Sequence, residues 1–301
     1  MSSIAYVTDQ KMIEYHRLCG SREINFWRLS SRAGFSSFHK GDLLFFYARG
    51  LHGKKKGLVG YAHYQGIHTM TLKQMWNRYG TQNGYDSLKD MQEAVEKASR
   101  DHKVPEKMTG LYLTDVVFFV TPVYPGDVGI TINDKLESYT YLDRDDPDIT
   151  VRILREAEKS GIDIWSASQS DEPEYIFRAD ELRHQLQLIC SEMGKEPLGS
   201  AELAKAKKLT REFAQREHYE MIRGSVTDCF ASDGTTLKIA VPFVYMAKNR
   251  QQRMKELLGK ITWYKTRIRT EGLRVDRTVF TVLSEEEQPL TVTLLKEINE
   301  G

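Results

Sequence analysis

The chain has 301 residues, of which 40% are hydrophobic and 28% charged, and its formal net charge is +1 at pH 7. This composition is typical of a globular protein with enough apolar material for a core, and the length favours two ordinary domains. The near-zero net charge excludes a globally basic nucleic-acid-binding protein but leaves local basic patches open. The first ten residues do not form a signal peptide, and no apolar run approaches the length of a membrane span.

The three cysteines, Cys19, Cys190 and Cys229, are far apart and show no metal-ligand spacing. We therefore expect buried thiols in a reducing compartment, which places the protein in the cytoplasm. No cofactor, no bound metal and no membrane contact is expected.

The N-terminal half alternates between strand-forming runs and short amphipathic segments. Strands are predicted at residues 4–7, 24–29, 43–47, 58–64 and 111–123. Helices are predicted at residues 8–18, 71–79 and 85–102, where apolar residues recur at helical spacing.

Residues 41–64, GDLLFFYARGLHGKKKGLVGYAHY, are the most informative stretch. Two apolar and aromatic runs flank a basic, glycine-containing loop, which predicts a hairpin with a long turn. Gly60 interrupts the second run, and a glycine at such a place indicates a bulge or a close backbone approach.

This stretch resembles the core of the PUA-like superfamily, closest to EVE-type domains and more distantly similar to YTH and ASCH domains. The resemblance rests on the Gly41-Asp42 turn, the strand that ends in Phe46-Tyr47, and residues 57–62 (GLVGYA), with residues 26–30 (FWRLS) as the strand that opens the pocket. It covers roughly the first half of the chain. It implies a small β-barrel whose aromatic pocket holds a modified nucleobase. EVE domains usually carry a Trp-x-Gly-Val-Arg-Asn type of segment, where this chain has Arg-Ala-Gly-Phe at residues 32–35.

The composition changes after residue 143, where acidic residues are in surplus up to residue 181. We place a domain boundary near Asp180, which gives domains 1–179 and 180–301. Helices are predicted at residues 150–159, 179–193, 201–222 and 251–268, and strands at 226–245 (two strands), 278–283 and 290–295. The expected fold class is α+β, with an N-terminal PUA-like small β-barrel with peripheral helices and a C-terminal α+β domain.

A base-binding pocket needs flat apolar walls for stacking and a few polar groups for the base edge. The N-terminal half has twelve candidate rings, most of which we expect in the core because alternate residues of a strand point inward. Trp27, Tyr47, Tyr61 and Trp76 are the predicted pocket walls, and Ser30 and Ser31 are the predicted edge-reading hydroxyls.

Two basic segments could contact phosphates, which is an electrostatic and sequence-independent interaction. One is the hairpin loop, with Arg49, Lys54, Lys55 and Lys56, which a solvated loop would explain as well. The other is the helix within residues 248–277, which has ten basic residues against three acidic ones. Its predicted phosphate contacts are Arg253, Lys260 and Arg267, spaced by seven residues. This helix could equally dock on the acidic segment, within the molecule or in a dimer.

We therefore expect a non-catalytic nucleic-acid-binding protein that reads a modified or flipped base in DNA or RNA. One alternative is a metal-dependent nuclease, or a nuclease-associated protein of the restriction or defence type, in which Asp228, Asp233 and Lys238 hold the metal. Another is a homodimeric interaction protein. The sequence has no phosphate-binding loop and no hydrolase motif.

Overall fold

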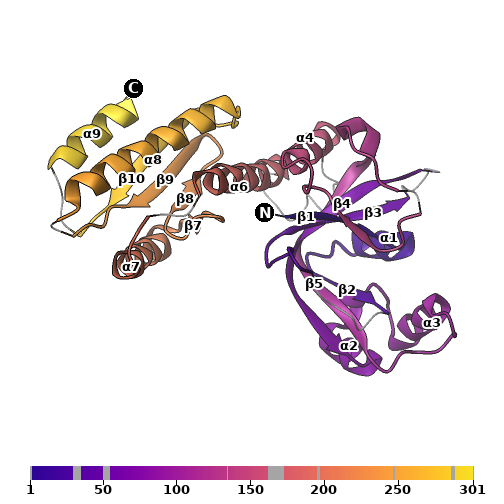
Figure 1. Ribbon diagram of the computed structural model, residues 1–301. Coiled ribbons are helices and arrows are strands. Elements are labelled where there is room, and N and C mark those ends of the chain that lie inside the picture. The colour runs from indigo at the N-terminus through magenta and orange to yellow at the C-terminus, as the bar shows by residue number, and fades with distance from the viewer. Residues whose placement is uncertain are drawn as a thin grey trace. The chain divides into compact units, whose positions relative to one another are not determined.

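The computed structural model describes residues 2–29, 35–49, 55–133, 135–161, 173–194, 197–246, 248–285 and 289–300. The fold is mixed α+β, as expected, and the chain forms two compact units, Met1–Phe177 and Arg178–Gly301 (Figure 1). The assignment of 1–179 and 180–301 as functional domains stays a prediction.

The first unit contains a six-stranded sheet with the order β2-β5-β4-β3-β1-β6. Its strands are β1 (Ser3–Val7), β2 (Ile24–Arg28), β3 (Leu43–Arg49), β4 (Lys56–Met70), β5 (Met108–Val123) and β6 (Tyr139–Tyr141). Strand β1 runs parallel to β3, and the other neighbours are antiparallel. In the described part of the chain the order is open between β2 and β6, so the sheet does not close into the barrel that the resemblance implied.

Strands β3 and β4 form the antiparallel hairpin predicted from residues 41–64. The predicted bulge is present, because the register between β4 and β5 shifts between Leu58 and Gly60. A Cβ atom on Gly60 would lie 2.4 Å from the carbonyl oxygen of Val117, which is closer than any side chain tolerates. Glycine is therefore required here by the close approach of β5.

The two faces of the sheet follow the alternation of residues along β3. Phe45 and Tyr47 point to one face, which α4 (Ile149–Ser160) and Phe177 at the start of α6 (Pro173–Met193) cover. Phe46 points to the other face, which α1 (Gln10–Leu18) covers. Each fully buried aromatic ring contributes about 1.5–3 kcal/mol, so this alternation fixes the register of the hairpin.

The far ends of β4 and β5 carry a smaller layer of helices, at the lower end of the first unit in Figure 1. These are α2 (Leu72–Tyr79), the 3₁₀ turn η1 (Gly80–Asn83) and α3 (Leu88–Ala98), which enclose a cluster around Met75 and Met91. Thr71 caps α2, as predicted, in a reciprocal capping box with Gln74. A second 3₁₀ turn, η2 (Pro125–Val128), follows β5.

The second unit contains a four-stranded sheet with the order β10-β9-β8-β7. Its strands are β7 (Glu220–Met221), β8 (Cys229–Ser232), β9 (Thr236–Pro242) and β10 (Arg277–Leu283), and its helices include α7 (Ser200–Glu217) and α8 (Arg250–Thr270). Strands β9 and β10 are parallel, and α8 supplies the crossover that parallel neighbours need. Leu257, Ile261 and Tyr264 of α8 pack into the core of this unit.

Residues 290–295 do not form the predicted strand, because they belong to the helix α9 (Pro289–Glu300). Threonine and valine suggested a strand, but Leu295 and Ile298 pack on the core at helical spacing, and proline starts the helix. The expected partner of this strand, β10, pairs with β9 instead. Asn299 of α9 accepts a hydrogen bond from the Phe280 amide (2.8 Å) and donates one to the Phe280 carbonyl (3.0 Å).

No helix among the described residues is both long and apolar enough to cross a membrane. All three cysteines are free thiols. Cys190 and Cys229 are buried, as expected, whereas Cys19 is exposed.

Candidate functional site

Tyr47 and Tyr61, two of the predicted pocket walls, lie in the packed core beneath α4. Their exposed fractions are 2% and 0%. The ring of Tyr61 contacts those of Phe45, Phe119 and Phe177, with centroid separations between 5.6 and 6.2 Å. Neither tyrosine therefore presents a ring face on which a base could stack in this conformation.

Trp27 and Trp76, the other two predicted walls, are half-buried in the cluster between α2 and α3. Trp27 lies 6.3 Å from the ring of Tyr85, in a tilted arrangement. The structure therefore divides the four predicted rings between two separate clusters and does not bring them to one site. Ser30 and Ser31 lie outside the described residues, so their predicted role stays a prediction.

A different group of aromatic side chains lies between the edge strands β2 and β6. Arg28, the last residue of β2, donates a hydrogen bond from Nη1 to Oη of Tyr6 over 2.8 Å. Its guanidinium carbon lies 5.5 Å from the ring centre of Tyr6 and 5.6 Å from that of Phe35, which is cation–π geometry. The Nε atom of Arg28 is buried and has no hydrogen-bond partner among the described residues.

Strand β6 extends this group along the edge of the sheet. Its two tyrosines share the face of Tyr6, because Tyr139 pairs with Tyr6 and Tyr141 with Ile4. Tyr139 stacks on Tyr6 at 5.7 Å and meets Phe35 edge-on at 5.0 Å. Both tyrosines of β6 are half-buried. We call Arg28, Phe35, Tyr139, Tyr141 and Arg144 the β2–β6 edge cluster.

The electrostatics of the edge cluster are set by its two arginines. The guanidinium of Arg144 lies 5.1 Å from the ring centre of Tyr141. Burial raises the pKa of the nearby Tyr64 phenol, and the positive charge of Arg28 opposes that shift. The cluster therefore combines ring faces with fixed cations, the arrangement that proteins use to hold unpaired bases.

Sequence reasoning missed the edge cluster, because its members are brought together by pairing between distant segments. A local signal was present in residues 138–141 (SYTY), because tyrosine and threonine both favour strands and the two tyrosines are two positions apart, on one face of a strand. Only the structure shows that this run pairs with β1.

Three of the four cations predicted for the hairpin loop, Arg49, Lys55 and Lys56, lie at its described ends. Arg49 pairs with Lys56 in the ladder, and Arg49 and Lys55 are exposed. The amine of Lys56 lies 5.8 Å from the ring centre of Tyr47. Lys54 lies outside the described residues, so phosphate contact by this loop stays a prediction.

The three cations predicted on the C-terminal basic helix form ion pairs within their own unit. Arg253 pairs with Glu202 (2.7 Å), Lys260 with Asp228 (2.7 Å) and Arg267 with Glu192 (2.6 Å). Hydrogen bonding from Arg253 lowers the pKa of Glu202 to about 2. None of these partners belongs to the acidic segment 143–181, whereas Arg274 does pair with Glu181.

Asp228 and Asp233, the two acidic residues of the nuclease alternative, have hydrogen-bond partners within the second unit, and Lys238 is exposed on β9. Asp228 is completely buried and accepts hydrogen bonds from Lys260 and from Oη of Tyr264, each over 2.7 Å. Asp233 accepts bonds from the amides of Thr235 and Thr236 in the turn between β8 and β9. Among the described residues, no group of three His, Cys, Asp or Glu side chains could hold a metal ion.

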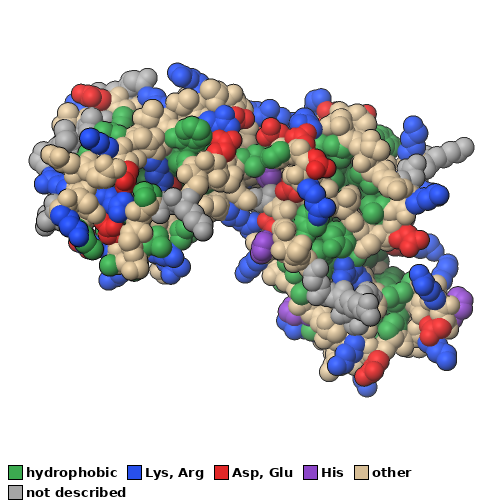
Figure 2. Space-filling view, viewed as in Figure 1, with side chains coloured by type: hydrophobic (Ala, Val, Ile, Leu, Met, Phe, Trp, Pro, Cys, Tyr) green, Lys and Arg blue, Asp and Glu red, His purple; other side chains and the backbone are tan. Residues whose placement is uncertain are grey.

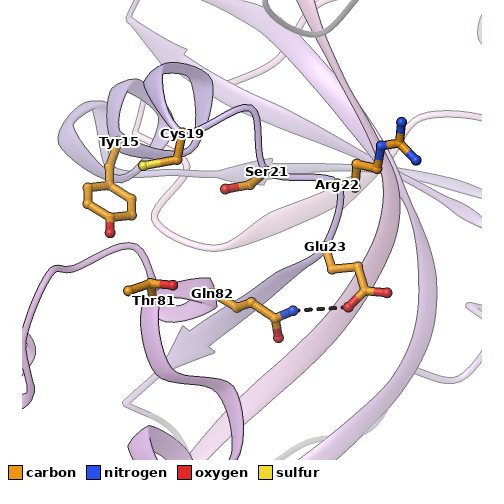
Figure 3. A pocket seen from close by; sticks show the side chains of 7 residues that line it. All are labelled: Tyr15, Cys19, Ser21, Arg22, Glu23, Thr81 and Gln82. Carbon is orange, nitrogen blue, oxygen red and sulfur yellow. Dashed lines mark hydrogen bonds between the residues drawn. The ribbon is translucent and has the colours of Figure 1, made fainter. Parts of the chain in front are cut away.

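A surface cleft of about 330 Å³ opens between α1, the start of β2 and η1. Its lining residues are Tyr15, Cys19, Ser21, Arg22, Glu23, Thr81 and Gln82 (Figure 3). Gln82 donates a hydrogen bond to Glu23 across the cleft over 3.0 Å, and the guanidinium of Arg22 points away from the other side chains. The cleft contains none of the predicted site residues, and with one aromatic ring it lacks the paired walls that a base needs.

Lys and Arg side chains are interspersed with Asp and Glu on the face of each unit shown in Figure 2. That view therefore has no broad basic field. A nucleic-acid contact on this face would depend on a few specific cations.

No family model matches the sequence, and no curated protein matches it either. Crystal structures of the ASCH protein of Zymomonas mobilis are similar to part of the chain. The unmodified protein is 14% identical, with a TM-score of 0.36, over 50% of this chain and 93% of its own. A Tyr-to-Phe variant gives 14% identity and a TM-score of 0.37, over 52% of this chain and 98% of its own. The assignment to the PUA-like superfamily, and within it to the EVE type, stays a prediction.

Proposed function

We propose that the first unit binds unpaired nucleotides of DNA or RNA at the β2–β6 edge cluster, and that it does so without catalysis. The observation that carries this proposal is one group of side chains that contains two half-buried tyrosines of an edge strand and two arginines that lie over aromatic rings. Arg28 lies over Tyr6 and Phe35, and Arg144 lies over Tyr141. Aromatic faces accept any base, and each stacked base contributes about 1–3 kcal/mol.

Arg28 supplies the polar contact that a base pocket needs. Its buried Nε–H is a donor with no partner among the described residues, and such a group costs about 1–3 kcal/mol when it stays unpaired. An acceptor on the edge of a bound base would satisfy it. A modified or flipped base, the finer part of this proposal, would be distinguished by the fit of its edge to Arg28.

The proposal is tested by titrating labelled single-stranded oligonucleotides into the protein at two salt concentrations. We expect Tyr139→Leu and Tyr141→Leu each to weaken binding about five- to fifty-fold, the equivalent of 1–2.3 kcal/mol of stacking. Tyr219→Leu, which changes a half-buried tyrosine of the second unit, is the matched control and should bind as the parent protein does.

Oligonucleotides that carry methylated or hydroxymethylated cytosine, or methylated adenine, test the finer claim. A preference for one of them that the Arg28→Lys change removes would support base reading. Equal binding to all of them that salt abolishes would mean that charge alone accounts for the binding. Unchanged binding by both tyrosine variants would refute the edge cluster as the site.

A further inference from the structure

The exposed face of α8 is not the face that carries Arg253, Lys260 and Arg267, the phosphate contacts predicted from the sequence. At 100° per residue, Arg253, Lys260 and Arg267 lie beside the buried stripe of Leu257 and Tyr264, which explains why they form ion pairs inside the unit. The opposite side of the helix is exposed. Its residues are Gln251, Gln252, Lys255, Gly259, Thr262, Trp263, Thr266, Arg269 and Thr270.

This outer face of α8 carries positive charge and no carboxylate. Neither Lys255 nor Arg269 forms an ion pair with a described residue, and both are exposed. The acidic residue within α8, Glu256, is half-buried and is held by Arg253 over 2.7 Å and by Gln252 over 2.9 Å. The cations of this face are therefore available to an external anion.

The spacing of the face suits a chain of phosphates. Lys255 and Arg269 are fourteen residues apart, which corresponds to about 21 Å along a helix. Three of the residues between them on this face, Gly259, Thr262 and Thr266, are small, so a backbone could approach closely and receive hydrogen bonds from the two hydroxyls. A single anion would contact one end only, whereas a polymer would contact both.

Trp263 adds an aromatic surface at the margin of this face. Its side chain is 41% exposed, which is unusual for so large an apolar group, and the guanidinium of Arg267 lies 5.9 Å from its ring centre. An exposed indole on a face that also carries Lys255 and Arg269 is suited to stack on a base whose phosphates these two cations hold.

We infer that the outer face of α8 is a second nucleic-acid contact, which binds the sugar–phosphate backbone through Lys255 and Arg269. This contact is independent of the edge cluster, because it recognises phosphates and lies in the other compact unit.

The test uses the full-length protein and a labelled abasic oligodeoxynucleotide, which has the phosphates and lacks the bases. We expect binding to weaken as the salt concentration rises. The slope of the logarithm of the association constant against the logarithm of the salt concentration should become shallower by about 0.7 for each cation removed. The Lys255→Gln/Arg269→Gln protein should therefore lose about 1.4 from the slope. The matched control is Lys73→Gln/Lys97→Gln, which removes two exposed lysines of the first unit and should keep the slope.

The result separates this inference from the proposed function. The Tyr139→Leu and Tyr141→Leu proteins should bind the abasic probe as the parent protein does, since that probe has no base to stack. Failure of the abasic probe to bind at low salt would overturn the inference, as would an unchanged slope in the α8 variant or an equal loss in the control. None of these three results would affect the tyrosine test with base-containing oligonucleotides.

Discussion

Arg28 on the edge strand β2 donates a hydrogen bond from Nη1 to Oη of Tyr6 on β1, 2.8 Å long. Strand β2 lies at one end of the strand order and β1 lies next to the other end, so this contact spans the opening that the ladder leaves. The same guanidinium lies over the rings of Tyr6 and Phe35. The side chain of Arg28 therefore links β2 to β1 and also places a positive charge at the candidate site.

The first prediction concerns Arg28→Lys, which keeps the charge and removes the planar group. A lysine cannot donate from Nε and Nη1 together while stacking on two rings, so we expect base-containing oligonucleotides to bind about tenfold more weakly. Arg17→Lys is the matched control, because Arg17 also lies over a ring, that of Phe118, at 5.5 Å, and three strands separate β5, which carries Phe118, from β6. A titration in which both variants lose equal affinity would argue against a specific role for Arg28.

The second prediction concerns the bulge in β4. Gly60→Ala would place a Cβ atom 2.4 Å from the oxygen of Val117 and 3.1 Å from Cα of Phe118, so backbone must move. We expect the free energy of unfolding to fall by about 1–3 kcal/mol or more, measured by urea denaturation. Gly66→Ala in the same strand meets no atom within 4 Å and should change it by less than about 0.5 kcal/mol. Equal effects of the two changes would show that the close approach to β5 is not what matters.

The third prediction is a pH dependence that originates at His16. The side chain is completely buried, and burial lowers its pKa to about 4 from an ordinary value of 6.5. Between these values the unfolded chain binds a proton that the folded protein excludes. The contribution of His16 to the free energy of unfolding is therefore fully present above pH 6.5. It is lost as the pH falls towards 4, by an amount on the order of 3 kcal/mol.

The measurement compares urea unfolding at pH 7.5 and pH 4.5 in the parent protein and in His16→Gln, which cannot titrate. The difference between the two pH values should shrink in the variant. His39→Gln, at a side chain that is 77% exposed, should keep the parent's difference. If His16→Gln retained the whole difference, other groups would have to account for it.

The fourth prediction concerns the buried ion pair of the second unit. Lys260→Gln would leave the carboxylate of Asp228 buried without its cation, so we expect a loss of about 3–5 kcal/mol in the free energy of unfolding. Asp228→Asn in the same protein should recover part of the loss, because it removes the stranded charge. Lys208→Gln breaks an exposed pair with Glu212 and should cost at most about 1 kcal/mol. Additive losses in the double variant would mean that the two side chains are not coupled.

The elements that could be predicted from the sequence are those whose signals are local. The β3–β4 hairpin, its bulge at Gly60 and the capped helix α2 each follow from alternation, a glycine or a capping residue within a few positions. The helix α9 was predicted wrongly as a strand, because threonine and valine favour strands until the packing of Leu295 and Ile298 decides otherwise.

The candidate site depends on contacts that no local signal contains. Tyr6 and Tyr139 are far apart in the sequence and become neighbours only when β6 pairs with β1. Conversely, Tyr47 and Tyr61 were predicted as pocket walls from the aromatic strands of the resemblance, but α4 and Phe177 cover their side of the sheet. The orientation of α8 does follow from the sequence. The apolar residues Leu257, Ile261 and Tyr264 define its buried stripe, and this stripe determines which cations lie beside the core.

The amide of Asn299 has a consequence for how copies of this protein meet. By satisfying both backbone groups of Phe280, it occupies the place that a strand from a second molecule would take at the rim of the C-terminal sheet. Trimming the last turn of α9 would leave these two backbone groups of the edge strand β10 without their partner and open to pairing with another strand. The last turn of α9 therefore protects this point of the sheet edge.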